Sequence, residues 1–67
     1  MRFSYNKLWK LLIDKNMLKK NLVEDAKISP TTISTMGKEK AVSLETLGRI
    51  CIFLDCNIGD IVDFIKE

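Results

Sequence analysis

The side chains able to do chemistry in this sequence are lysines and hydroxyl residues, which gather between Lys19 and Lys40. The hydroxyls come mainly from one stretch, Ser29-Pro30-Thr31-Thr32-Ile33-Ser34-Thr35. Such groups suit binding, because an ammonium attracts an anion and a hydroxyl can donate or accept a hydrogen bond. They do not suit catalysis, because the chain has no histidine, no nucleophile–base pair and no glycine-rich phosphate loop. We therefore expect no catalytic residue and no enzyme activity.

The two cysteines fit a structural role better than a chemical one. Cys51 and Cys56 lie five residues apart, and no histidine or third cysteine is present to complete a metal site. We expect core residues in a reducing cytoplasm, with no metal, no cofactor and no small-molecule substrate. The longest apolar run, residues 50–54, is far too short to cross a membrane, and no signal peptide is visible.

Charge is distributed unevenly along the 67 residues, although the formal net charge is only +2. Residues 1–40 carry nine basic and four acidic side chains, a local balance of +5. Residues 41–67 carry two basic and five acidic side chains, a local balance of −3. The first part suits an anionic partner, but a solvated surface with chance clustering would give the same counts.

The spacing of apolar residues predicts helices that would position these groups. The predicted helices cover about 5–14, 19–26, 30–36, 44–54 and 58–65. Ser4, Ser29, Ser43 and Asn57 are the expected N-caps, and Gly37 ends the third helix. The expected core face of the fourth helix consists of Leu44, Leu47, Ile50, Cys51 and Leu54. We expect an all-α fold, a compact five-helix bundle forming a single domain over residues 1–67.

The segment 19–36 is the most informative part of the chain. Two short helices joined by about three residues cannot pack side by side, so they should cross steeply as a helix-turn-helix. In that arrangement Leu22 and Ile33 meet inside the angle, and Ile28 fills the turn. Tyr5 and Trp9, which could serve as a stacking platform, are expected in the core because they share a helical face with Leu8 and Leu12.

The chain resembles the Xre-family, phage-repressor-like (Cro type) regulators in their short stand-alone form. The resemblance rests on KKNLVEDAKISPTTIS at 19–34 and on VSLETL at 42–47, followed by Ile50-Cys51, Leu54-Asp55-Cys56 and Ile58-Gly59-Asp60-Ile61. It covers nearly the whole chain. It implies a five-helix, lambda-repressor-like fold that binds double-stranded DNA and controls transcription, with repression as the expected outcome.

The resemblance also implies roles for individual residues. The third helix would enter the major groove, with Pro30, Thr31, Ser34 and Thr35 facing bases and Thr32 facing a phosphate. Lysines at the start of the second helix and after the third would bind the DNA backbone. The expected DNA-binding set is Lys19, Lys20, Ser29, Pro30, Thr31, Thr32, Ser34, Thr35, Lys38 and Lys40.

Two features depart from the family pattern. Lys27 stands where the family often has glycine, at a turn position that can require a positive φ, and Val23 replaces a small residue. The third helix also has no Arg, Gln or Asn, the residues that discriminate bases most strongly. We therefore expect modest sequence specificity that depends partly on DNA shape.

The expected partner besides DNA is a second copy of the chain, because one small domain covers only half of a two-fold operator. The expected dimer interface is the acidic C-terminal helix with Phe64 and Ile65, and an extended segment around residues 2–4 is its rival. The alternative function is a protein-binding module of the same fold, such as an antitoxin-like or regulatory subunit, because the fold alone does not prove DNA contact.

Overall fold

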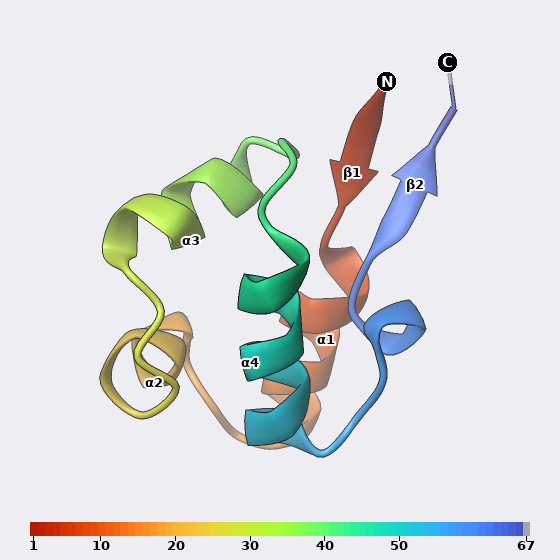
Figure 1. Cartoon of the computed structure of the whole chain (residues 1–67). Helices are drawn as coiled ribbons and strands as arrows, with labels where there is room; N and C mark the ends of the chain where they lie inside the picture. Colours follow the sequence, from red (N-terminus) through yellow and green to blue (C-terminus); the bar gives the residue numbers. More distant parts are fainter. Residues whose placement is uncertain (67) are drawn as a thin grey trace.

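The structure is a computed structural model that describes residues 1–66 (Figure 1). Its elements are β1 (Arg2–Ser4), α1 (Asn6–Asp14), α2 (Lys19–Glu24), α3 (Pro30–Gly37), α4 (Leu44–Leu54), the 3-10 turn η1 (Ile58–Asp60) and β2 (Asp63–Ile65). Glu67, counted above among the acidic residues, lies outside the described residues. The helical prediction is confirmed for the first four helices, and α1 packs behind α4 in Figure 1.

The predicted fifth helix is wrong, and with it the five-helix count. Of the residues predicted to form this helix, only Ile58–Asp60 are helical, and they make a single 3-10 turn, η1. Asn57 caps this turn by accepting a hydrogen bond from the Ile58 N–H at 2.8 Å. The chain then extends, and β2 pairs antiparallel with β1, with Phe3 opposite Phe64. Pairing between the two ends of the chain replaces the expected helix, and a local apolar pattern carries no signal for such a distant partner.

The core is a single cluster to which all four α-helices contribute. Leu8 and Leu12 come from α1, Leu22 from α2 and Met36 from α3, and each is at most 2% exposed. The predicted face of α4 is buried except for Leu44, which is 72% exposed. Leu44 is the first residue of α4, and because helical side chains lean toward the N-terminus, it points past the edge of the core.

The turn between α2 and α3 confirms the helix-turn-helix. Figure 1 shows α2 nearly end-on and α3 lengthwise, so their axes cross steeply. Ile28 is 4% exposed, and its N–H donates to the Leu22 carbonyl at 3.0 Å. Lys27 has φ 61°, the left-handed conformation expected where the family often has glycine. The steep crossing of α2 and α3 therefore requires Lys27 to adopt a strained backbone conformation.

The cysteines lie where α4 ends. Cys51 is buried, Cys56 is partly buried, and both thiols are free. Burial and the neighbouring Cys51 thiol raise the pKa of Cys56 to about 11, so its thiol stays protonated at neutral pH and is a poor nucleophile. Among residues 1–66, the helices are all too short or too polar to cross a membrane.

Replacing Lys27 with glycine should stabilise the fold. Glycine adopts a positive φ without the steric cost that lysine bears, so the free energy of unfolding should rise by up to about 1 kcal/mol. Urea denaturation followed by circular dichroism measures the change. The matched control is Lys10→Gly at the exposed middle of α1, which should lower the free energy of unfolding by about 1 kcal/mol. A loss of stability in Lys27→Gly would contradict the strained turn.

Candidate nucleic-acid interface

The helix α3 presents an outer face of small side chains. Pro30, Thr31 and Ser34 are exposed, whereas Met36 on the opposite side is 1% exposed and Ile33 packs partly against the core. The helix begins as predicted, because the Ser29 hydroxyl accepts a hydrogen bond from the Thr32 N–H at 3.1 Å and Pro30 occupies the first helical position. A hydroxyl-bearing surface of small side chains therefore faces solvent, without long side chains to obstruct a close approach.

The hydroxyls of α3 and its cap divide into two groups. Ser29 and Thr32 share a hydrogen bond of 2.8 Å, and the Thr35 hydroxyl donates to the Thr31 carbonyl at 3.0 Å. The hydroxyls of Thr31 and Ser34 make no hydrogen bond to any other part of residues 1–66. The first group stabilises the helix, and the second is available to an external partner.

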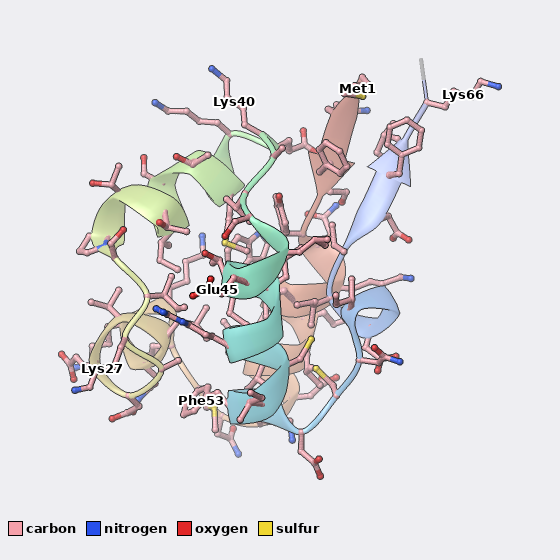
Figure 2. All side chains as sticks on the ribbon, viewed as in Figure 1. Met1, Lys27, Lys40, Glu45, Phe53 and Lys66 are labelled. Atoms are coloured by element: carbon pink, nitrogen blue, oxygen red, sulfur yellow. The ribbon has the colours of Figure 1, made fainter. Side chains whose placement is uncertain are left out.

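The predicted lysines lie at both ends of the helix-turn-helix. Lys20, Lys38 and Lys40 are exposed, and none has an acidic partner within the described part of the chain. Figure 2 shows Lys40 extending outward from the loop after α3, while Lys27 extends outward from the turn before it. These ammonium groups remain available to anions on either side of α3.

Lys19 is held differently from the other lysines. Its Nζ lies 4.3 Å from the centre of the Trp9 ring, a distance typical of a cation–π contact. Trp9 is partly buried against the core, so it fixes the approach of Lys19 to the start of α2. The prediction that Tyr5 and Trp9 lie in the core is confirmed for Tyr5, which is 1% exposed, and only in part for Trp9, which is partly buried.

The acidic residue within the basic loop is neutralised. Glu39, which lies between Lys38 and Lys40 in sequence, accepts a hydrogen bond from Arg2 at 2.8 Å. The Tyr5 hydroxyl donates to the Lys40 carbonyl at 2.8 Å, and burial raises the pKa of Tyr5, so the phenol keeps its proton. Contacts from β1 and the start of α1 therefore fix the loop after α3 and remove the repulsion that Glu39 would exert on an anion.

Sequence reasoning missed several residues that shape this surface. Arg2 and Tyr5 act on residues more than thirty positions away, and no local pattern predicts such pairs. Lys27 is a further exposed cation beside α3 that the expected DNA-binding set lacks. The sequence does point to it, because a lysine is unusual at a turn position that suits glycine. The expected set otherwise lies at the turn, at the start of α2, along α3 and in the loop after it.

Comparisons with known proteins agree with this geometry. The family model described as "Cro/C1-type HTH DNA-binding domain" matches residues 7–67. Among solved structures, "Crystal structure of transcriptional regulator VanUg, Form II" is similar, with a TM-score of 0.93 and 48% identity over 98% of this chain and 88% of the other. A search of curated proteins gave no significant match. The chain belongs to the Cro/C1-type helix-turn-helix DNA-binding domain family.

A matched pair of substitutions separates the structural hydroxyls from the available ones. Ser29→Ala removes the N-cap of α3 and should lower the free energy of unfolding by about 1 kcal/mol. Ser34→Ala makes the same chemical change without losing an observed hydrogen bond, so stability should stay within about 0.5 kcal/mol of the original. Thermal or urea denaturation measures both. Equal losses in the two variants would show that the Ser29 cap does not hold α3.

Proposed function

We propose that this Cro/C1-type domain is a transcriptional regulator that places α3 in the major groove of double-stranded DNA and represses transcription by occupying its site. The observation that carries the proposal is the outer face of α3, where the hydroxyls of Thr31 and Ser34 bond to no other group of residues 1–66. Hydroxyls of this kind can hydrogen-bond base edges, and a threonine methyl can contact the methyl group of thymine. The name of the VanUg structure, a transcriptional regulator, supports the same role for this chain.

The lysines supply the contacts to the DNA backbone in this proposal. Lys19 and Lys20 begin α2, and Lys38 and Lys40 follow α3, so cations stand on both sides of the groove-facing helix. Phosphate contacts of this kind set position and affinity but carry no direct sequence information. The ammonium groups of Lys20, which is exposed, and of Lys19, which lies over the Trp9 ring, would both bind phosphates of the DNA strand beside α2.

The other members of the expected set have supporting roles. Pro30 lies at the exposed start of α3, where it can contact a base or sugar. Ser29, Thr32 and Thr35 already stabilise the helix, and their oxygens can accept a further hydrogen bond. Because α3 has no Arg, Gln or Asn, we propose modest base specificity with a contribution from DNA shape.

The proposed working form is a homodimer in the cytoplasm that binds rather than catalyses. One domain covers one half-site, and a two-fold operator requires two. Residues 58–66 do not form the C-terminal helix that the sequence predicts as the interface. Instead, Asp63–Ile65 (β2) pair with Arg2–Ser4 (β1), the rival segment. Two free thiols, one of them buried, fit a reducing compartment.

Salt dependence tests the backbone contacts. Affinity for duplex DNA should fall steeply with salt, and Lys20→Ala or Lys38→Ala should each lower the slope of log affinity against log salt concentration by about 0.9. The control is Lys7→Ala, because Lys7 is already bound to Asp63 at 3.0 Å and should leave the slope unchanged. Fluorescence anisotropy at several salt concentrations measures all three. Affinity independent of salt would contradict the proposal.

Selection of bound duplexes from a random pool tests the base contacts. The original chain should enrich a short motif, and Thr31→Ala should relax preference at one position while leaving the salt slope unchanged. Lys20→Ala should instead weaken binding to all sequences alike. A pool that stays random, together with no retention of duplex DNA at low salt, would favour the protein-binding module over the regulator.

A further inference from the structure

We propose that Cys51 and Cys56 form an oxidisable dithiol, which closes reversibly to a disulfide when the chain meets a small peptide disulfide. The new bond joins the last turn of α4 to the residues that lead into η1. The inference goes beyond the proposed function and does not rest on it, because neither cysteine belongs to the helix-turn-helix surface.

The backbone at the end of α4 brings the two cysteines together. Asp55 adopts the left-handed conformation, with φ 53°, and the Cys56 N–H donates to the Cys51 carbonyl at 3.0 Å. This is the Schellman ending of a helix, in which the two residues joined by that hydrogen bond commonly contact each other. Standard backbone dimensions then keep the two Cα atoms within about 7 Å, the limit for bridging two cysteines.

The two side chains also meet. Both thiols are free, and a hydrogen bond joins the Cys56 side chain to that of Cys51. Apolar side chains ordinarily make the contact between these two positions of a Schellman ending. Cysteine at both positions gives the contact one property that apolar side chains lack, because two adjacent thiols can be oxidised to a covalent bond without a large movement of the backbone.

The Cys56 side chain is the one that a solute reaches first. It lines a cavity of about 390 Å³ between α1 and the end of α4, a volume within the usual range of small-molecule sites. Lys10, Lys15, Asp14 and Asp55 line the same cavity and are all exposed. Ammonium and carboxylate groups side by side suit a zwitterionic partner, such as a disulfide built from amino acids.

The proposed reaction is thiol–disulfide exchange in two steps. The Cys56 thiolate attacks one sulfur of the small disulfide, whose S–S bond breaks and releases the first small thiol. The Cys51 sulfur then attacks the Cys56 sulfur of this mixed disulfide and releases the second small thiol. The two protein thiols are oxidised, the small disulfide is reduced, and the two protons pass to the two released thiols.

The environment of Cys56 makes this reaction slow at neutral pH. Burial, the Cys51 thiol and Asp60 of η1 raise the pKa of Cys56 to about 11, whereas Lys15 after α1 acts in the opposite direction. Only the thiolate attacks, and below the pKa its fraction rises tenfold with each pH unit. Closure should therefore accelerate about tenfold per unit between about pH 7 and pH 9.

Oxidised glutathione is the probe that tests the dithiol. The full chain is incubated in mixtures of reduced and oxidised glutathione and then unfolded with N-ethylmaleimide, which labels free thiols, before mass spectrometry. The original chain should pass from a doubly labelled form to an unlabelled monomer that has lost two hydrogens, and dithiothreitol should restore labelling. Cys51→Ala should stop at a mixed disulfide on Cys56. Cys56→Ala should react at least about tenfold more slowly, because Cys51 is only 9% exposed.

Three results would overturn the dithiol, and the original chain alone can give each of them. These are two labelled thiols at every glutathione ratio up to pH 9, a mixed disulfide that persists on Cys56, or disulfides that form only between chains. Circular dichroism checks that the variants keep the original fold. The closed form should also melt roughly 5 °C or more above the reduced form. A lower melting temperature would show that the bond does not fit the folded turn.

DNA binding by the closed form separates this inference from the proposed function. Figure 1 shows that the pair lies at the opposite end of α4 from the loop after α3, and the 11 residues of α4 place it roughly 16 Å along the helix. The closed and reduced forms should therefore bind duplex DNA with affinities within about twofold of each other. Loss of binding in the closed form alone would overturn this independence. Failure of both forms to bind would sink the proposed function and leave the disulfide standing.

Discussion

The burial of Met36 is the interaction on which the rest of this structure depends. The helix α3 has eight residues, and four of them are threonine or serine, which are poor helix formers. A helix of this length is not stable alone. It persists because Met36 enters the core, Ser29 caps its start and Ile28 closes the turn before it. Since α3 is anchored from one side, its other side is free to carry small hydroxyl residues.

The electrostatics follow from the same arrangement. Some of the basic side chains of residues 1–40 are paired with acidic ones: Arg2 is bound by Glu39, and Lys7 is bound by Asp63. The lysines around the helix-turn-helix have no acidic partner within residues 1–66, and Lys19 is held by an aromatic ring instead. A net charge of +2 therefore understates the field beside α3, where cations gather around a surface that suits a polyanion.

Local patterns predicted most of this architecture, and distant pairings account for what they missed. The caps Ser29 and Ser43, the end of α3 and the left-handed Lys27 followed from residue type and spacing. The pairing of β2 with β1 and the bond from Tyr5 to the Lys40 carbonyl join residues far apart in sequence, so periodicity could not predict them. The site was predicted as a set of residues, but the division between helix-stabilising and available hydroxyls required coordinates.

Mapping the DNA contact by NMR tests the central claim most directly. A uniformly ¹⁵N-labelled chain is titrated with a selected duplex, and the amide shifts are followed residue by residue. The account predicts the largest changes along α3, at the start of α2 and in the loop 38–40, with Thr31 and Ser34 among them. Changes centred on Lys7 and the β1–β2 sheet, with α3 unaffected, would contradict it.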